Sequence, residues 1–176
     1  MDTQKTIWTI GHSTLSFDEF VEMLQSFDIK TIVDVRSYPG SRRYPQFNKE
    51  NLEVALPGKD IQYIHIPQLG GRRKVNPDSQ NTLWRHPAFR GYADYMGTDA
   101  FKEGINLLTQ EAVMHRTAIM CSEAVWWRCH RSLISDYLKS IGWKVMHVMD
   151  VNKEQEHPYT SAARIVDGRL TYKALL

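Results

Sequence analysis

The chain alternates short apolar segments typical of β-strands with longer amphipathic segments typical of helices, and this alternation restricts the fold more than any other feature. Residues 6–10 form a short apolar run that ends at Gly11. Ser16 and Glu19 then have the spacing of a capping box, and apolar residues recur at helical spacing up to Phe27. Strands separated by helices need crossover connections, so the pattern predicts a mostly parallel sheet covered by helices on both faces.

The same patterns place the remaining elements. Further strands are expected at residues 31–35, 61–66, 117–121 and 143–149. Helices are expected at residues 17–27, 48–56, 87–96, 99–114 and 126–141. An Asp-Gly turn at 167–168 favours an antiparallel hairpin over residues 165–170. We therefore expect a single α/β domain over residues 1–176, with a sheet of about five strands.

The composition excludes several classes of protein. Hydrophobic residues make up 42% and charged residues 24% of the 176 residues, values that exclude a disordered or fibrous chain. No apolar run approaches the length of a membrane span, and we expect neither a membrane partner nor a secretory signal. Since two cysteines cannot build a disulfide framework, we expect a cytoplasmic protein with reduced thiols.

The net charge of +2 conceals a strong segregation of charge along the chain. Residues 36–49, 70–92 and 126–131 together contain half of the 22 Lys and Arg residues but only one of the 20 acidic residues. Each of these segments follows a predicted strand. Because the carboxyl ends of parallel strands lie at one edge of an α/β sheet, where ligands bind, the three segments are expected to form one electropositive rim.

Arg128 and Arg131 point to an anion at this rim. Both lie in the first turn of the predicted helix 126–141, where the helix dipole disfavours cations. A bound phosphate explains this placement, because Arg binds phosphate through paired hydrogen bonds and the helix adds free N–H groups. Pairing of these arginines with Glu123 or Asp34 is the structural alternative.

Residues with acid–base or nucleophilic chemistry also follow the predicted strands. Cys121 ends the fourth strand and is a candidate nucleophile, since nearby arginines and a helix N-terminus acidify a thiol. His130 is a candidate base, although His130 and Cys129 equally suit the buried face of the helix. The other candidates for proton transfer are His12, Asp34 and Glu123. The sequence has no second closely spaced pair of metal ligands, so neither a metal nor a cofactor is expected.

Aromatic residues lie among these cations. They are Tyr38, Tyr44, Phe47, Trp84, Phe89, Tyr92, Trp126 and Trp127. Aromatic rings beside arginines are typical of sites that stack unpaired bases, although some of these rings equally suit the core. The pattern favours a nucleotide or nucleic acid over a small phosphorylated metabolite.

An ordered set of short motifs resembles a known family. The motifs are Thr9-Ile10-Gly11-His12-Ser13, Asp34-Val35-Arg36 with Pro39 and Ser41, Phe47-Asn48, Leu69-Gly70-Gly71, Tyr92-Ala93-Asp94-Tyr95-Met96, Cys121-x-Glu123 and Cys129-His130-Arg131. In this order they are similar to the bacterial and archaeal family called domain of unknown function 488, over residues 6–150. The resemblance implies one α/β domain with a site at the strand ends.

The resemblance also implies which residues form the site. The polar positions shared in the family correspond here to His12, Ser13, Asp34, Arg36, Ser41, Asn48, Cys121, Glu123, Cys129, His130 and Arg131. The chain departs from the family pattern at residues 126–128, where a proline-containing turn is expected in relatives. This departure favours Arg131 over Arg128 as an anion ligand.

Three functions follow, in decreasing order of preference. The first is an enzyme, a hydrolase or transferase, that acts on a phosphate-bearing ligand, with Arg36, Arg42 and Arg131 holding the anion. The expected binding set is completed by Ser13, Ser41, Asn48 and Arg72. The second is a non-catalytic nucleic-acid-binding module, and the third is a thiol redox or sulfur-transfer protein. Residues 67–86 form a long irregular segment that is expected to act as a lid.

Overall fold

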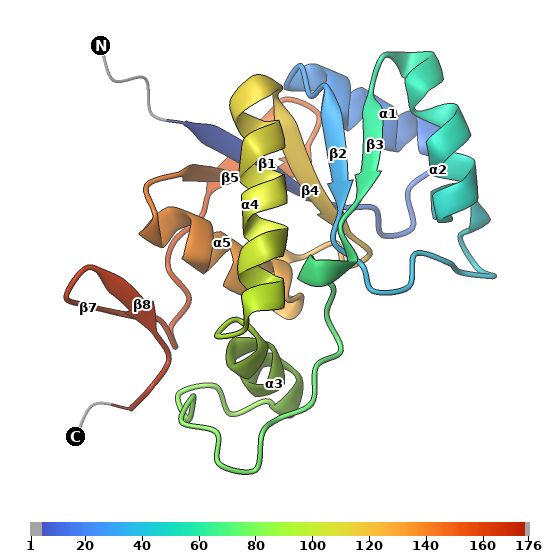
Figure 1. The fold of residues 1–176 in the computed structure, drawn as a ribbon. Helices are drawn as coiled ribbons and strands as arrows, with labels where there is room; N and C mark the ends of the chain where they lie inside the picture. The colour runs from blue at the N-terminus through green and yellow to red at the C-terminus, as the bar shows by residue number, and fades with distance from the viewer. Residues whose placement is uncertain (1–4, 175–176) are drawn as a thin grey trace.

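A six-stranded sheet forms the centre of the computed structural model, which describes residues 5–174 (Figure 1). Its strands are β1 (Thr6–Gly11), β2 (Thr31–Asp34), β3 (Gln62–His65), β4 (Thr117–Cys121), β5 (Lys144–Asp150) and β6 (Lys153–Glu156). They are ordered β3-β2-β4-β1-β5-β6, and the first five run parallel while β6 is antiparallel to β5. The mostly parallel sheet expected from the alternation of elements is therefore confirmed.

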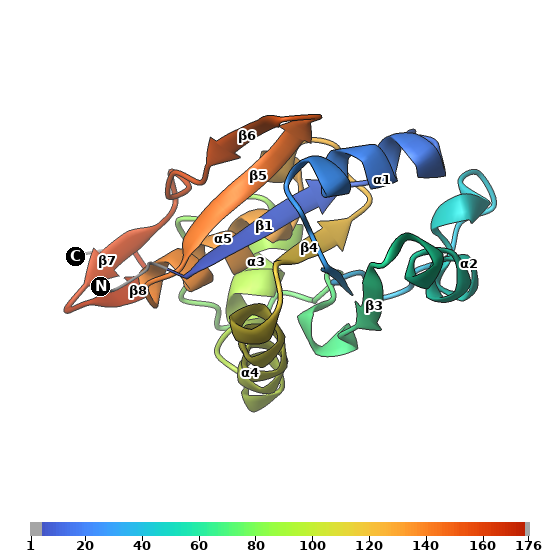
Figure 2. The same ribbon diagram turned by 90° about the horizontal axis from the view of Figure 1, so that it is seen from above.

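Five α-helices in this part of the chain cover the two faces of the sheet. They are α1 (Phe17–Ser26), α2 (Lys49–Ala55), α3 (Pro87–Tyr95), α4 (Asp99–Met114) and α5 (Arg131–Ser140). Seen from above, α1 and α4 lie on opposite sides of the sheet (Figure 2). Residues of α1 and α2 belong to one hydrophobic core, whereas residues of α3, α4 and α5 belong to a second. None of these helices has both the length and the apolar character needed to cross a lipid bilayer.

Helix α1 shows how local sequence directs local structure. The Ser16 side chain accepts a hydrogen bond from the Glu19 N–H at 3.1 Å, and the Glu19 carboxylate accepts one from the Ser16 N–H at 2.9 Å. The predicted capping box is therefore confirmed. Phe20, Val21 and Leu24 are buried, since residues three and four positions apart share one face of a helix.

The helix predicted over residues 126–141 is instead divided in two. A 3₁₀ turn, η4 (Trp126–Arg128), is followed by Cys129 in an extended conformation (φ −132°, ψ 151°), and α5 begins after it. The break accompanies a tertiary contact, because Trp126 is buried and stacks on His147 with a ring-centroid distance of 4.6 Å. Helical spacing in a sequence cannot reveal such a contact. Arg128 therefore lies outside the first turn of α5.

Strand β6 has no counterpart among the predicted strands. Its residues, Lys153–Glu156, are all polar and exposed, so the segment lacks the apolar pattern from which strands are recognised. The strand pairs with β5, placing Gln155 opposite His147. Charged side chains on this edge hinder the addition of a strand from another molecule.

A two-stranded hairpin follows the sheet near the C-terminus. The predicted C-terminal hairpin is confirmed as β7 (Arg164–Val166) and β8 (Arg169–Thr171). Its turn residues Asp167 and Gly168 both have positive φ, at 52° and 76°, as tight hairpin turns require.

The irregular segment before α3 is fixed to that helix. The carboxylate of Asp94 accepts hydrogen bonds from the backbone N–H of Asn76, the hydroxyl of Ser79 and the side-chain amide of Asn81. The segment is thus tied down in its middle. The expectation that residues 67–86 act as a lid stays a prediction.

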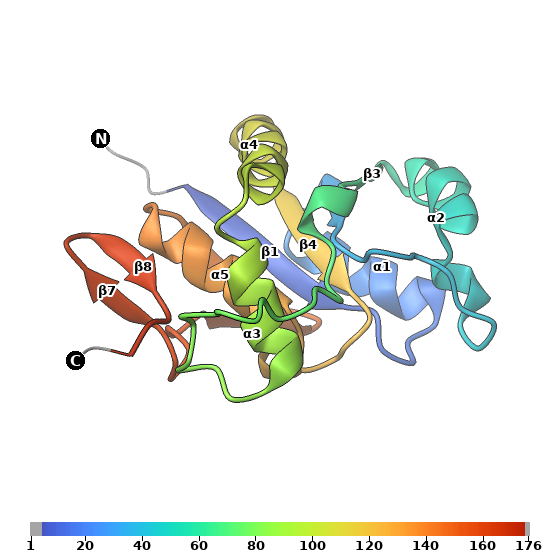
Figure 3. The same ribbon diagram turned by 60° about the horizontal axis from the view of Figure 1, so that its bottom comes forward.

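The carboxyl ends of β1, β2 and β4 meet at one edge of the sheet. Gly11 at the end of β1 is level with Cys121 at the end of β4, and Asp34 at the end of β2 is level with Met120. Helix α3 lies at this edge (Figure 3). The residues that follow these strands are therefore brought together, as a parallel sheet requires.

Candidate functional site

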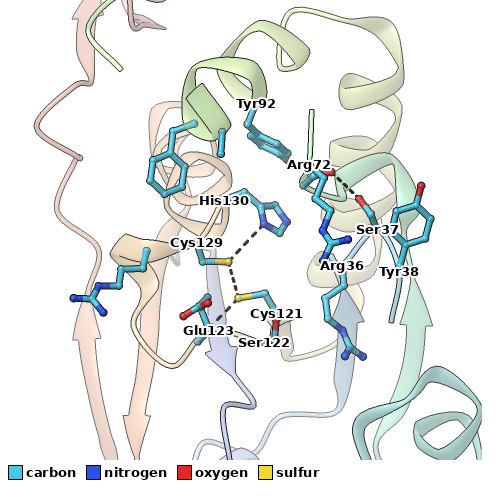
Figure 4. Close-up of a pocket in the computed structure, with 14 residues that line it drawn as sticks. Arg36, Ser37, Tyr38, Arg72, Tyr92, Cys121, Ser122, Glu123, Cys129 and His130 are labelled. Carbon is cyan, nitrogen blue, oxygen red and sulfur yellow. Dashed lines mark hydrogen bonds between the residues drawn. The ribbon is translucent and has the colours of Figure 1, made fainter. Parts of the chain in front are cut away.

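A cavity of about 240 Å³ opens at this edge of the sheet (Figure 4). Its wall is built by the segments that follow β2, β3 and β4, by the residues just before α5, and by α3. The polar and thiol side chains that line it include Arg36, Arg72, Cys121, Glu123, Arg128, Cys129 and His130, and the aromatic ones are Tyr38, Phe89 and Tyr92. Arginines from all three basic segments of the sequence thus reach a single cavity.

Two glycines allow the segments of the wall to approach one another closely. A Cβ atom at Gly11 would lie 1.6 Å from the carbonyl oxygen of Glu123, and one at Gly70 would lie 2.3 Å from Oγ of Ser37. Any side chain at these positions would push the wall apart. The shape of the cavity therefore depends on both glycines.

Two free cysteines line the cavity side by side. Cys121 ends β4 and Cys129 precedes α5, and their Sγ atoms lie 2.7 Å apart in a hydrogen bond (Figure 4). Burial raises the pKa of Cys121 well above its usual value, and the bond to Cys129 adds to this effect. Burial also opposes ionisation of Cys129, but the thiol of Cys121 and the charge of Arg131 outweigh it and lower the pKa of Cys129. The two thiols therefore differ in acidity, and Cys129 is the more acidic of the pair.

The start of α5 further stabilises a thiolate at Cys129. The backbone N–H of Arg131 points to the Sγ atom of Cys129 at 3.4 Å. This N–H belongs to the first turn of α5, whose dipole favours negative charge. Cys129 is therefore the more nucleophilic thiol, whereas the sequence led us to expect Cys121 in that role.

His130 faces the same sulfur atom as a defined tautomer. Its Nε2 atom lies 2.7 Å from the carbonyl oxygen of Val35, and since a carbonyl can only accept, Nε2 carries a proton. In the neutral ring Nδ1 is then an acceptor, and it lies 3.5 Å from Sγ of Cys129. Burial lowers the pKa of His130 below its usual value, which keeps the ring neutral near pH 7. The arrangement contains a nucleophile, a base and a group that orients the base.

The three arginines of the cavity wall differ in their partners. In residues 5–174, Arg72 and Arg128 have exposed side chains that form no ion pair. Arg36 instead donates to both carboxylate oxygens of Asp34, at 2.8 and 2.9 Å, and to the carbonyl oxygen of Phe47 at 2.6 Å. The charge of Arg36 is therefore neutralised, while Arg72 and Arg128 remain available to a ligand.

Arg131 does not reach the cavity. Its side chain is buried and donates to Thr9 Oγ1 at 3.1 Å and to the carbonyl oxygens of Glu123 and Ala124 at 2.7 and 3.4 Å. These bonds hold the loop that follows β4 against the end of β1. The structure thus places Arg128 at the cavity and Arg131 behind it, whereas the family resemblance favoured Arg131 as the anion ligand.

Asp34 and His12 also lie behind the cavity. Asp34 is fully buried and accepts hydrogen bonds from Arg36 and from the hydroxyl of Tyr63. Burial and the neighbouring carboxylate raise the pKa of Tyr63 far above its usual value. His12 stacks on Phe47 with a centroid distance of 4.3 Å, and burial lowers its pKa to about 4. Both residues therefore stabilise this edge of the sheet and do not line the cavity.

The remaining residues expected from the family resemblance shape neighbouring loops. The N–H of Ser41 donates to Oδ1 of Asn48 at 2.6 Å, and its hydroxyl accepts from two further backbone N–H groups. Ser13 has a φ of 47° and its carbonyl oxygen accepts from His12 at 2.9 Å. Arg42 is exposed on the loop after β2, away from the cavity lining. The residues expected from the charge pattern or from the family resemblance that do line the cavity are Arg36, Arg72, Cys121, Glu123, Cys129 and His130.

A second polar cluster, which no sequence pattern indicated, lies behind Arg131. We call its members, Thr9, His147, His157 and Asp136, the buried histidine chain. Thr9 Oγ1 lies 2.5 Å from Nδ1 of His147, the two histidines are joined at 2.8 Å, and His157 reaches Asp136 at 2.8 Å. The available signal was a histidine in the middle of an apolar strand, at position 147.

The cysteines and histidines of this region do not form a metal site. Among residues 5–174, no three or more His, Cys, Asp or Glu side chains are grouped so as to hold a metal ion. The two thiols and His130 interact with one another instead.

Comparison with known proteins identifies the family. A family model described as "Domain of unknown function DUF488" matches residues 16–138, which include α1, the whole of β2 to β4 and most of α5. Neither a curated protein nor a solved structure matches the chain significantly.

Proposed function

The chain belongs to the DUF488 family, whose description assigns no activity, and we propose its function from the site. We propose that the protein is an enzyme, a hydrolase or transferase, in which Cys129 attacks a phosphate-bearing ligand. A nucleotide or nucleic acid is the class of ligand that best fits the rim. The observation that carries the proposal is the contact of Cys129 with both His130 and the start of α5, inside a cavity bordered by available arginines.

The chemical step begins at Cys129. Its proton passes to Nδ1 of His130, whose Nε2–H stays on the carbonyl oxygen of Val35. The thiol of Cys121 and the N–H of Arg131 then stabilise the thiolate. The thiolate attacks the electrophilic atom of the ligand: a bond from Sγ to this atom forms, the bond from this atom to the leaving group breaks, and the leaving group departs with the proton held by His130. If water then takes the bound group from Cys129, the reaction is a hydrolysis. If a second substrate takes it, the reaction is a transfer.

Arg72 and Arg128 supply the positive charge that holds the phosphate. Both line the cavity, and a guanidinium matches the geometry of phosphate oxygens. Arg72 also has a φ of 60°, a conformation that costs a residue with a side chain about 1 kcal/mol or more. Backbone held in such a conformation beside a cavity is typical of functional sites. The exposed carboxylate of Glu123 provides a second proton carrier at the rim.

Aromatic side chains at the cavity favour a nucleotide over a simple phosphate ester. Tyr38 is 76% exposed at the lip, and Phe89 of α3 lines the wall. The cavity volume of about 240 Å³ lies below the 300–1,000 Å³ of most ligand pockets. The cavity therefore suits the phosphate and the reacting group, while a base stacks on the exposed ring. The two free thiols are in keeping with a reducing compartment, and we propose a cytoplasmic location.

Alkylation by iodoacetamide tests the assignment of the nucleophile. At pH 7 we expect Cys129 to react at least about tenfold faster than Cys121, since only the thiolate reacts. Inorganic phosphate or AMP at millimolar concentration should slow this reaction, because an anion at the rim covers the thiolate. The Cys121→Ser variant should keep the fast labelling, and Cys129→Ser should lose it. Equal labelling of the two thiols, or a rate that neither phosphate nor AMP changes, contradicts the proposal.

A non-catalytic nucleic-acid-binding module is the second candidate, favoured by exposed cations on the loop after β2. Arg42 and Arg43 are exposed on this loop, which runs from the cavity edge towards α2 (Figure 1). A strand lying from Arg72 to this loop would contact several phosphates. Its affinity would then fall steeply between low and moderate salt, and Cys129→Ser would bind a single-stranded oligonucleotide as tightly as the wild type. A salt-independent affinity excludes this candidate.

A further inference from the structure

We propose that Cys121 and Cys129 form a reversible disulfide when a peroxide enters the cavity, which makes the site an oxidation-sensitive switch. The chemistry of this step requires only the two thiols. Its consequence, loss of the nucleophile, rests on the proposed function. The juxtaposition behind the proposal is an Sγ–Sγ distance of 2.7 Å between residues eight positions apart.

The two sulfur atoms are already placed for bond formation. A disulfide bond joins two sulfur atoms at about 2.05 Å, so closing the pair requires a shift shorter than a single C–C bond. Cys121 is held at the end of β4 by the sheet, and Cys129 is held by the turn before α5. The two side chains already meet across this gap. The local backbone therefore favours closure within one molecule over pairing between molecules.

The two thiols have distinct roles in this reaction. Cys129 ionises readily, because the start of α5 and the thiol of Cys121 stabilise its thiolate, so it is the sulfur that meets the oxidant. Cys121 remains protonated and buried, and it is the thiol that completes the bond. This division matches that of a peroxide-reactive cysteine and a resolving cysteine.

The electron balance of the step is complete with a peroxide as oxidant. The Cys129 thiolate attacks one oxygen of the peroxide, the O–O bond breaks, and the leaving hydroxide takes up a proton to become water. Cys129 is then a sulfenic acid. Sγ of Cys121 attacks this sulfur, the S–O bond breaks, and the hydroxyl leaves as water with the proton of the Cys121 thiol. Two thiols are oxidised by two electrons and the peroxide is reduced to water.

The cavity admits an oxidant of this size. Cys129 and Cys121 both line it and are 6% and 2% exposed. A volume of about 240 Å³ holds several molecules of the size of water, which each occupy about 30 Å³ in the liquid. Hydrogen peroxide can therefore reach the sulfur atoms, whereas a bulky disulfide would have to displace the wall.

The disulfide would stop chemistry without removing the anion site. Bond formation removes the thiolate that the Arg131 N–H faces. Arg72 and Arg128 are not part of the bond, and their side chains remain at the rim. The oxidised protein should therefore still bind phosphate while it no longer reacts with iodoacetamide.

The test is intact-mass analysis after treatment of the full-length protein with one equivalent of hydrogen peroxide at pH 7. The wild type should lose two hydrogens and both titratable thiols, and dithiothreitol should restore them. Cys121→Ser should instead gain one oxygen at Cys129, trapped by dimedone. Cys129→Ser should react at least about tenfold more slowly, because its remaining thiol stays protonated. Circular dichroism of each variant confirms that it is folded.

Two results overturn the switch. One is a wild type that gains oxygen atoms without losing two hydrogens, and the other is a disulfide formed only between two molecules. Either result leaves the phosphate protection of Cys129 untouched, so the proposed function survives it. Conversely, a clean intramolecular disulfide with alkylation that phosphate does not slow supports the switch and contradicts the proposed function.

Discussion

Two polar clusters lie on either side of Arg131, and they differ in whether their donors and acceptors are all occupied. Cys121, Cys129 and His130 line a cavity that a ligand can enter. The buried histidine chain is sealed, and each of its four members is at most 1% exposed. The difference shows that a histidine can adjoin open space that a ligand can enter, as His130 does, or can have its hydrogen-bonding positions filled and so contribute to stability, as His147 and His157 do.

Hydrogen bonds run without a break along the buried histidine chain. Arg131 can only donate, so Thr9 accepts from it through Oγ1, and the same oxygen contacts Nδ1 of His147. Burial and the positive charges nearby lower the pKa of His147 to about 2, so this ring is neutral. His147 contacts His157, whose Nε2 donates to the carboxylate of Asp136. The chain thus links the side chain of Arg131 to that of Asp136 through hydrogen bonds.

The largest effect is expected from Asp136→Asn. Asp136 accepts hydrogen bonds from His157, from the N–H and hydroxyl of Thr160 and from the hydroxyl of Tyr172. Asn places an NH2 group where these donors need an acceptor, which leaves buried polar groups unsatisfied and should cost about 3–5 kcal/mol of unfolding free energy. Urea unfolding measures it, with the exposed Asp150→Asn as a control. A loss below about 1 kcal/mol would show that the chain is not a stabilising unit.

A somewhat smaller effect is expected from mild acid. His147 and His12 have pKa values of about 2 and about 4 in the folded protein, against 6.5 for the unfolded chain. Below pH 6.5 the unfolded state therefore binds protons that the folded state does not, and stability falls as the pH falls. Each histidine should cost about 1.4 kcal/mol per pH unit, or about 2 kcal/mol by pH 5.

Urea unfolding at pH 7 and pH 5 checks this dependence. His12→Gln should reduce the pH dependence of the unfolding free energy by the contribution of one histidine, because it removes one of the two titrating rings. The residue lies outside the cavity lining. An unchanged stability across this range would mean that both rings take up protons in the folded protein as they do in the unfolded chain, and it would contradict the lowered pKa values. Carboxylates contribute little above pH 5, since their usual pKa values are about 4.

A tenfold effect on binding is expected from Arg72→Ala. This guanidinium lines the cavity without an ion partner among residues 5–174, so its loss should weaken phosphate binding about tenfold, or about 1.4 kcal/mol. Stability should change by less than about 0.5 kcal/mol, as for other exposed positions. Calorimetry with inorganic phosphate measures the affinity, with the exposed Lys74→Ala as a control. An equal loss of phosphate affinity in both variants would show that the cations attract phosphate only through a diffuse positive potential and not through a specific contact with Arg72.

The smallest expected effect distinguishes binding of a nucleotide from binding of inorganic phosphate. Tyr38→Ala should weaken AMP binding by about 1 kcal/mol, because the ring offers a stacking surface to a base. Its affinity for inorganic phosphate should not change. Val54→Ala removes another exposed apolar side chain and serves as the control. If AMP binds the Tyr38→Ala variant normally, the base does not stack at this lip.

The sequence predicts those parts of the fold that local patterns determine. The capping box at Ser16 and the Asp-Gly turn at residues 167–168 depend on neighbours a few positions away, and both are confirmed. Strand β6 depends on pairing with β5 alone, and its four polar residues show no apolar pattern. The split of the predicted helix 126–141 results from Trp126 stacking on a distant strand, which periodicity does not register.

The candidate site was predictable as a region but not in its details. Parallel strand order brings Gly11 level with Cys121, so residues after the strands had to meet. The direction of each side chain was not accessible, because it depends on burial. Arg131 turns inward to backbone carbonyls, whereas Arg128 is exposed and borders the cavity. The same limit applies to the thiol pair, since only the folded turn before α5 brings Cys129 to Cys121.

Arg131 belongs to both regions at once, through different atoms. Its main-chain N–H faces Sγ of Cys129, and its side chain crosses to the other side of the loop after β4. A substitution here keeps the N–H but removes the side chain that holds this loop against the end of β1, so the position of the thiol pair depends on a residue whose side chain never enters the cavity. The exposed side chains of Arg72 and Arg128 carry no such double duty, and substitutions there should leave the architecture intact.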